Sequence, residues 1–303
     1  MVARGGITAS PGPNHWPQCL SISTMLHTAI CLLLLGLSSW ATAAGETSPR
    51  AYYIANMGVM IERGETKILF DPLFSNHFGT YEPVPAEVEA ALLAGSEPWD
   101  GIDAVFISHH HGDHFDPATV LELLRTQPTI ELFGPEQAAA AIRNLVIDPD
   151  DALLERVHGL SLENGEAAVD VELGSLLVEA VRIRHSGWPE RHADVENLVF
   201  RVTLDSETTV MHFGDADPVD EHFAKAPEHW QERHTHFAMP PYWFFYSQEG
   251  RQILEDRIGA GYAVGMHVPT AVPDDPASRR KNLQDVDLFT EPGETRAIPR
   301  TSF

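Results

Sequence analysis

Apolar residues recur along the chain mainly in short runs that Gly, Pro, Asp and Asn separate, a pattern that predicts strands joined by turns. The first three runs, at residues 51–56, 59–62 and 66–70, are separated by tight breaks and predict an antiparallel meander. A short apolar stretch at 237–239 leads into five consecutive aromatic residues. We expect further strands at residues 102–107, 129–133, 152–162, 167–173, 175–184, 198–204, 208–213 and 262–266.

Helical patterns lie between these runs, at residues 87–93, 118–125, 135–143, 219–225 and 249–258. Asp116 followed by Pro117 is a typical helix start, with a side chain that caps the helix and a proline in its first position. Strands and helices alternate without an internal repeat or a clear linker, which predicts a single α/β domain. The long connection 73–97 is rich in aromatic residues and prolines and is typical of a lid or binding loop.

Residues 1–44 differ from the rest because they hold no Asp or Glu and a single Arg. An apolar run at 29–37 precedes small residues at 41–45, as in a signal peptide cleaved after Ala43 or Ala44. The run is short for a membrane span, and a retained N-terminal anchor is the competing interpretation. We therefore expect a periplasmic or secreted protein without stable membrane association after cleavage. Its single domain would comprise residues 45–303, with a Pro-rich tail from about 269.

The net charge and the positions of the cysteines restrict the possible functions of the protein. The formal net charge of −24 gives no general attraction to nucleic acid, because phosphate binding needs a basic surface. An anionic small-molecule substrate would need a metal or a few local arginines; Arg182, Arg184 and Arg191 either hold such an anion or are solvated surface charges. Both cysteines, Cys19 and Cys31, lie in the predicted signal peptide, so the mature chain would have no thiol. An oxidising compartment fits such a chain.

The sequence Ser-His-His-His-Gly-Asp-His-Phe at residues 108–115 follows the predicted buried strand 102–107. Neutral imidazole and carboxylate are ligands that suit zinc, iron and manganese, and a loop at the end of a strand is a common place for chemistry. If the loop alternates, His110 points away from its neighbours and is not a ligand. The candidate ligands here are His109, His111, Asp113 and His114.

Three further candidates, His185, Asp215 and His267, each follow a later apolar run. Seven oxygen or nitrogen donors are too many for one four-coordinate ion. Two ions about 3.5–4 Å apart that share a carboxylate would use them all. His212, within the strand 208–213, is expected to be a core histidine or a partner of a ligand. Asp71, at the end of the third strand, is either a turn cap or a functional residue.

The motif His109-x-His111-x-Asp113-His114, with His185, Asp215 and His267 downstream, resembles the metallo-β-lactamase superfamily, and within it the UlaG-like metal-dependent hydrolases. Three further stretches support this branch: residues 54–62 through 71–72, residues 214–215 and residues 266–268. The resemblance implies a four-layer αββα sandwich with the metal site at one edge. It implies one ion on His109, His111 and His185, another on Asp113, His114 and His267, and Asp215 between them. It also implies that Asp71 orients a ligand.

The resemblance implies a hydrolase with one or two divalent ions, zinc first and Mn²⁺ or Fe as alternatives. A metal-activated hydroxide would attack a small ester, lactone, amide or phosphodiester, with Asp113 and Asp215 as catalytic residues. A non-catalytic metal-binding protein on the same scaffold is the alternative. The acidic charge disfavours an RNA-processing enzyme.

Weaker candidates surround this set. His192 could contact substrate or be a surface residue. We expect half of the aromatic residues 242–246 in the core and the others around the pocket. The remaining histidines are expected to be mainly solvated, with His236 the best placed for the pocket: His222, His229, His234 and His236.

Overall fold

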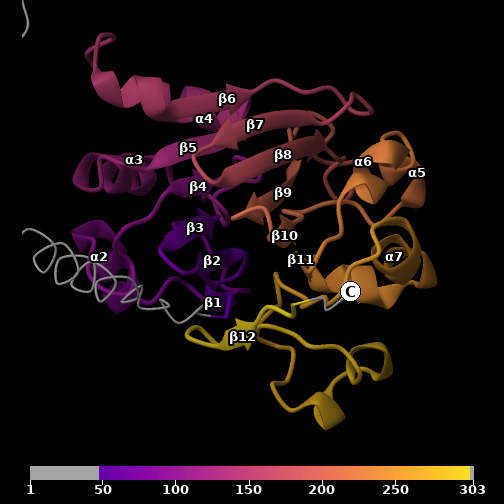
Figure 1. The fold of residues 1–303 in the computed structure, drawn as a ribbon. Coiled ribbons are helices and arrows are strands. Elements are labelled where there is room, and N and C mark those ends of the chain that lie inside the picture. The colour runs from indigo at the N-terminus through magenta and orange to yellow at the C-terminus, as the bar shows by residue number, and fades with distance from the viewer. Residues whose placement is uncertain (1–47, 301–303) are drawn as a thin grey trace, which may run out of the picture. The chain divides into compact units, whose positions relative to one another are not determined.

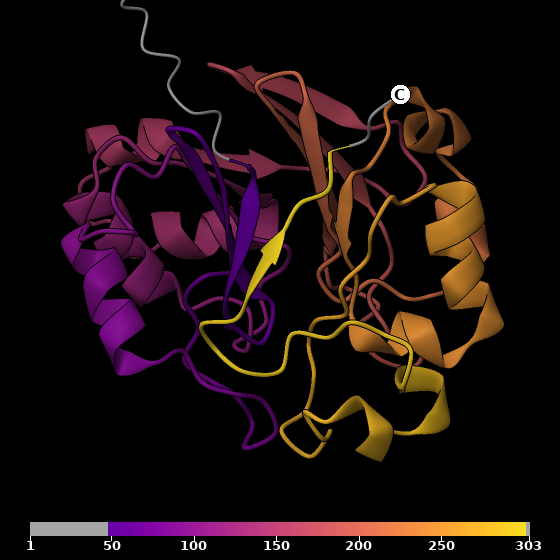
Figure 2. The same ribbon diagram turned by 60° about the horizontal axis from the view of Figure 1, so that its bottom comes forward.

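The computed structural model describes residues 48–300, which form two β-sheets packed face to face with helices on their outer sides (Figures 1 and 2). The seven-stranded sheet has the order β12-β1-β2-β3-β4-β5-β6. Its strands are β1 (Arg50–Ala55), β2 (Gly58–Arg63), β3 (Thr66–Phe70), β4 (Ala104–Phe106), β5 (Glu131–Pro135), β6 (Val157–Leu160) and β12 (Thr295–Ala297).

The five-stranded sheet has the order β11-β10-β9-β8-β7. Its strands are β7 (Val169–Leu173), β8 (Leu176–Arg182), β9 (Leu198–Leu204), β10 (Thr208–His212) and β11 (Phe237–Met239). β1 to β3 form the predicted antiparallel meander, whereas β3, β4, β5 and β6 run parallel. The loops that follow parallel strands collect at one edge of the sheet, which is where ligands bind in open α/β sheets.

Two groups of helices cover the outer faces. α2 (Ala86–Ala94), α3 (Pro117–Thr126) and α4 (Glu136–Arg143) pack on the seven-stranded sheet. α5 (Asp220–Phe223), α6 (Pro227–Glu232) and α7 (Gln248–Gln252), with the π-helical turn Ile253–Arg257, pack on the five-stranded sheet. The layers are therefore helix, sheet, sheet and helix, which confirms the predicted αββα sandwich.

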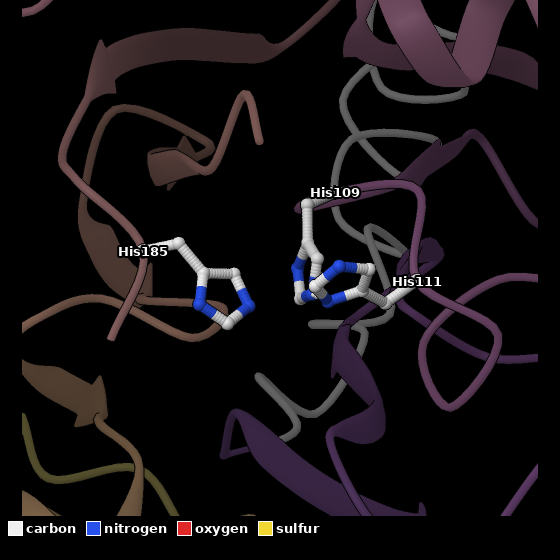
Figure 3. A group of neighbouring side chains, drawn as sticks. All are labelled: His109, His111 and His185. Atoms are coloured by element: carbon white, nitrogen blue, oxygen red, sulfur yellow. Dashed lines mark hydrogen bonds between the residues drawn. The ribbon is translucent and has the colours of Figure 1, made fainter. Parts of the chain in front are cut away.

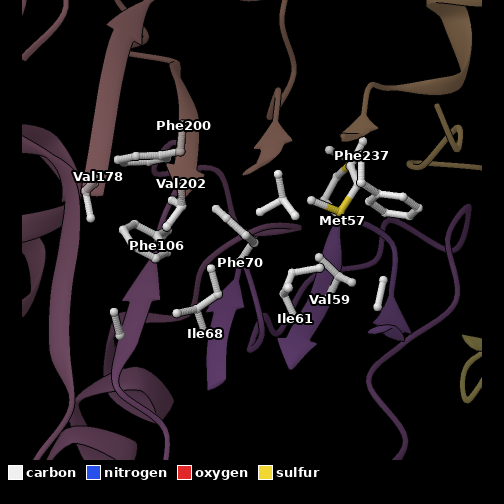
Figure 4. Close-up of a cluster of buried hydrophobic side chains, with 14 of the residues drawn as sticks. Met57, Val59, Ile61, Ile68, Phe70, Phe106, Val178, Phe200, Val202 and Phe237 are labelled. Atoms are coloured by element: carbon white, nitrogen blue, oxygen red, sulfur yellow. The ribbon is translucent and has the colours of Figure 1, made fainter. Parts of the chain in front are cut away.

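The period-two alternation of the strands builds the core between the sheets (Figure 4). In β3, Phe70 faces this inner core while Leu69 faces the helices. In β9, Phe200 faces inward and Val199 faces α5 to α7. Phe106 meets Phe200 across the sandwich with 5.2 Å between ring centroids. This packing holds the two sheets, and the loops at their edge, in a fixed relation.

Two predicted strands were wrong in part. The segment 152–162 begins as the 3-10 helix Ala152–Arg156, because the Asp151 side chain caps it by accepting a hydrogen bond from Leu153 N. The segment 262–266 makes only isolated bridges, such as Met266 with Pro241, and no continuous strand. Prolines 240 and 241 have no N–H to donate, so the ladder with β11 cannot continue through them.

Both ends of the chain differ from the central sandwich in how far their predictions can be checked. The Pro-rich tail contains β12, which pairs antiparallel with β1 and was not predicted. Helix α6 was also not predicted. The predicted signal peptide lies outside the described residues. Within residues 48–300, no helix is long and apolar enough to cross a membrane.

Candidate metal centre

Four chain segments bring the predicted ligands together at one edge of the sandwich. Residues 108–115, the ligand loop, follow β4 of the seven-stranded sheet. His185 and Asp215 follow β8 and β10 of the five-stranded sheet, and His267 follows the bridged segment at Met266. All seven predicted side chains are therefore brought to one place.

His109, His111 and His185 form the triple-histidine cluster, and their imidazoles point toward one another (Figure 3). His109 Nε2 lies 3.1 Å from His111 Nδ1, and the ring of His185 is 4.8 Å from each of the other two rings. His185 Nδ1 donates a hydrogen bond of 2.8 Å to the carbonyl of Ser186. Its buried Nε2 then has no hydrogen-bond partner, as expected for an atom that binds metal.

Asp113, His114 and His267 form the mixed cluster. His267 Nε2 lies 3.1 Å from His114 Nε2 and 3.3 Å from Asp113 Oδ2. In both clusters the ligand atoms lie within 4.8 Å of one another, close enough to share one ion. The two clusters reproduce the two ligand sets that the family resemblance implies.

Asp215 lies between the two clusters. Its Oδ1 is 3.2 Å from His114 Nε2 and 3.3 Å from His267 Nε2, whereas its Oδ2 is 3.4 Å from His185 Nε2. Oδ1 is buried and makes no hydrogen bond, so it is available to a cation. One carboxylate thus presents one oxygen to each cluster.

The preceding Gly214 explains how Asp215 reaches this position. Gly214 has a φ of 53°, in the left-handed region, and a Cβ there would lie 2.4 Å from Asn197 Oδ1 and 2.6 Å from Ser108 Cβ. Asn197 Oδ1 also accepts a hydrogen bond of 2.9 Å from Asp215 N. Only glycine allows this close approach.

Asp71, fully buried at the end of β3, orients the mixed cluster. Its Oδ2 accepts hydrogen bonds from His114 Nδ1 at 2.9 Å and Ser108 Oγ at 2.6 Å, and its Oδ1 accepts one from Ser108 N at 2.7 Å. The proton of His114 is therefore held on Nδ1, and Nε2 faces the site. A carboxylate behind a histidine in this way fixes the tautomer of a metal ligand.

The electrostatics of the triple-histidine cluster and of Asp215 suit a cation, whereas at His114 the attraction of Asp215 and Asp71 outweighs burial and raises the pKa, so a metal must displace a proton there. Burial lowers the pKa of His109 well below its usual value and, helped by the charge of His185, lowers that of His111 to about 4. Burial alone would raise the pKa of Asp215, but the attraction of His267 and His114 outweighs it and holds the pKa well below its usual value. His109 and His111 are thus neutral and Asp215 is ionised at neutral pH, the states that metal binding requires.

A cavity of about 280 Å³ opens onto the clusters. Phe78, Tyr81 and Trp243 are the aromatic residues, other than histidines, that line it. Sequence reasoning did not single out Phe78 or Tyr81, although both lie in the connection 73–97 that predicted a binding loop. A larger cavity of about 570 Å³, lined by Arg63 and His234, contains none of the seven candidate ligands. His236 lines that second cavity, so its expected place near the ligands was wrong.

Four histidines outside the ligand set lie in different environments. His110 is exposed, consistent with its exclusion. His212 is a core residue that stacks on Phe70 with 5.0 Å between centroids, and its Nε2 donates to the carbonyl of Met57. His222 and His229 are buried, so the expectation that they are solvated was wrong. The expectation failed because Trp188 packs against the His222 ring, and Arg201 and Trp230 contact the His229 ring.

Comparison with known proteins places the chain in a family. Residues 66–235 match the sequence model of the family described as Beta-lactamase superfamily domain, and the chain belongs to this family. Protein Rv0786c of Mycobacterium tuberculosis is 32% identical over 84 residues, which are 28% of this chain and 32% of the relative. The match thus spans about a third of that curated relative.

Solved structures share the fold. Igni18, a novel metallo hydrolase from Ignicoccus hospitalis, superposes with a TM-score of 0.54 at 17% identity, covering 82% of this chain and 98% of the other. An isothiocyanate hydrolase from Delia radicum gut bacteria gives a TM-score of 0.54 at 18% identity with the same coverage of both chains. At these identities the likeness shows the fold alone. Family and clustered ligands together define a metal-dependent hydrolase of the metallo-β-lactamase fold.

Proposed function

We propose that the chain hydrolyses a small ester, lactone, amide or phosphodiester at a centre of two divalent ions, zinc being the first candidate. The observation that carries the proposal is the placement of Asp215, whose two oxygens face different ligand clusters. A single ion would need only one of the clusters. The seven donors, and the unpartnered Nε2 of His185 and Oδ1 of Asp215, fit two ions well.

When bound, divalent ions supply a Lewis acid and a water whose pKa falls from 15.7 to about 7. The chain's own residues must then position substrate and move protons. Hydrolysis adds the water oxygen to carbon or phosphorus, breaks the bond to the leaving oxygen or nitrogen, and delivers a proton to that atom. Asp113 is placed for proton movement, because its Oδ2 borders the cavity beside His267. Attraction to His267 and His114 outweighs burial and lowers the pKa of Asp113, so it enters the reaction as an acceptor.

We also propose that the protein acts in the periplasm or outside the cell. The support is the apolar run at 29–37 followed by small residues at 41–45. Expression of the full chain, followed by N-terminal sequencing of the exported protein, tests this point. A mature chain that starts at Ala44 or Gly45 supports export, and an uncleaved cytoplasmic chain contradicts it.

The decisive experiment combines metal analysis with a panel of ester, lactone, amide and phosphodiester substrates. Two equivalents of metal and turnover on at least one substrate class are expected for the wild-type protein. Asp215→Ala and His111→Ala should abolish turnover while circular dichroism shows a folded chain. His110→Ala is the matched control, because it removes an exposed imidazole from the same loop.

Two results would contradict the proposal. Full activity of Asp215→Ala would show that the shared carboxylate has no role. Two equivalents of metal without turnover on any class would favour a non-catalytic metal-binding protein.

A further inference from the structure

The cavity at the ligand clusters has two chemically different walls. One wall is aromatic and lies beside His267. The Tyr81 ring meets the His267 ring edge-on, with centroids 4.2 Å apart and an angle of 85°, and the Trp243 ring is 5.2 Å from the same imidazole. Phe78 also lines the cavity, with 61% of its surface exposed. These rings offer flat apolar surface to a bound molecule.

A second wall is polar and lies beside His185. It is formed by Ser186, Arg191 and His192. The His192 ring lies 4.5 Å from the His185 ring and 4.9 Å from the His111 ring, so this wall directly adjoins the triple-histidine cluster. Among the described residues that line this cavity, Arg191 is the one with a permanently cationic side chain, since no lysine and no other arginine lines it.

Arg191 is an exposed residue that lines the cavity from the loop that follows His185. Its backbone N–H donates to the carbonyl of Gly187 at 2.9 Å. Its guanidinium lies across Gly187, where a Cβ would come within 3.1 Å of Arg191 Nη2. Because Gly187 has no side chain and a φ of 90°, the guanidinium can lie beside the turn that carries His185 and Ser186.

Arg191 is also without an acidic partner. Several arginines elsewhere in the fold pair with carboxylates, such as Arg201 with Glu179, Arg257 with Asp220 and Arg296 with Asp287. No carboxylate in residues 48–300 pairs with the Arg191 guanidinium within salt-bridge distance. In a chain of net charge −24, an unpaired guanidinium at the mouth of the cavity is a site for an anion.

We propose that the cavity takes substrates with a flat apolar group on one side of the scissile bond and one anionic group on the other. The apolar group would lie against Phe78, Tyr81 and Trp243. A carboxylate of the substrate would accept two parallel hydrogen bonds from Arg191. The scissile bond would then lie between the walls, over Asp215. This inference rests on the proposed hydrolase function and specifies its substrate class.

A matched pair of esters tests it: monophenyl glutarate and phenyl pentanoate. Both release phenol from an acyl chain of the same length, and they differ in one terminal carboxylate. Arg191→Gln should raise KM for the glutarate ester about tenfold more than for the pentanoate ester, since a charge-assisted hydrogen bond is lost. Phe78→Ser should raise KM for both esters alike, because both carry the phenyl group.

Arg125→Gln is the control for net charge, because Arg125 pairs with Asp151 on the surface of α3. It should change the ratio of the two KM values less than twofold. An equal shift of both esters in Arg191→Gln would overturn the inference. So would an equal change of the KM ratio in Arg191→Gln and Arg125→Gln.

A binding experiment with compounds that cannot be hydrolysed tests this inference separately from the proposed function. The ketones 5-oxo-5-phenylpentanoate and 1-phenylpentan-1-one have the same two shapes and cannot be hydrolysed. Calorimetry on metal-loaded protein should show that Arg191→Gln weakens binding of the ketone carboxylate about tenfold relative to the neutral ketone. Absence of turnover on every class of the substrate panel, with this binding pattern intact, would contradict the proposed function alone. Loss of the binding pattern would contradict the inference.

Discussion

The substitution Asp71→Asn tests the role of the buried carboxylate behind the mixed cluster. Asp71 accepts three hydrogen bonds, two from Ser108 and one from His114 Nδ1. Asparagine has the same shape and tolerates the φ of 41° at this position, so the backbone should not move. It offers one acceptor oxygen and one NH₂ donor in place of two acceptor oxygens.

The lower-energy arrangement of the substituted amide keeps its oxygen on Ser108 N and turns the NH₂ group toward His114. Nδ1 of His114 must then accept a hydrogen bond, so the imidazole proton moves to Nε2. That atom is 3.2 Å from Asp215 Oδ1 and 3.1 Å from His267 Nε2, at the place where the ligands converge. Loss of such an orienting partner typically weakens metal binding 10- to 100-fold, or about 1.4–2.8 kcal/mol.

Competition with a chromophoric chelator measures the metal dissociation constant directly. The control is Asp116→Asn, because Asp116 caps α3 just beyond the ligand loop and asparagine caps helices equally well. The control should bind metal as the wild-type protein does. A dissociation constant for Asp71→Asn within twofold of wild type would refute the orienting role.

Three further outcomes are expected. Gly214→Ala should lower the free energy of unfolding, measured by urea titration, by about 2–4 kcal/mol, because the added Cβ strains a left-handed φ and clashes with its neighbours. Gly174→Ala is the control: its φ of 57° is also left-handed, but its Cβ would meet open space, so the loss should be about 1 kcal/mol. Burial and Arg201 lower the pKa of His229 to about 4, so its contribution to stability is complete above pH 6.5 and is lost as the pH falls toward 4. His229→Asn should therefore remove about 2 kcal/mol of the stability difference between pH 7.5 and pH 5, measured on metal-free protein; an unchanged difference would count against this pKa. Divalent metal at a hundred times its dissociation constant should raise the free energy of unfolding by about 2.7 kcal/mol, and a chelator should reverse the gain.

The clustering of the candidate ligands could be predicted because short, local sequence patterns mark these residues. The ligand loop is one continuous motif, and Asp215 follows an apolar run that ends in Gly214. Asp116 likewise caps α3 as predicted, accepting from the backbone N–H groups of Ala118 and Thr119. In each case a short stretch of sequence contains both the element and its boundary.

Other features depend on contacts between distant residues, which carry no local signal. His229 lies in polar sequence, yet it is buried because Arg201 of β9 reaches across to it. β12 is short and polar, and it forms because β1 would otherwise be an open edge. The sequence could name Arg191 as a candidate, but only the structure shows that no carboxylate of residues 48–300 pairs with it.

The candidate metal centre draws on both sheets, and this has a consequence for folding. Contact between His114 and His267 closes a loop of 153 residues. Residues 48–300 contain no cysteine, so no covalent bond links distant parts of this region. An ion held by both histidines would bind only where the fold brings them together, so its binding free energy would stabilise the contact between these distant segments. Loss of the metal would then destabilise the fold as well as abolish the activity.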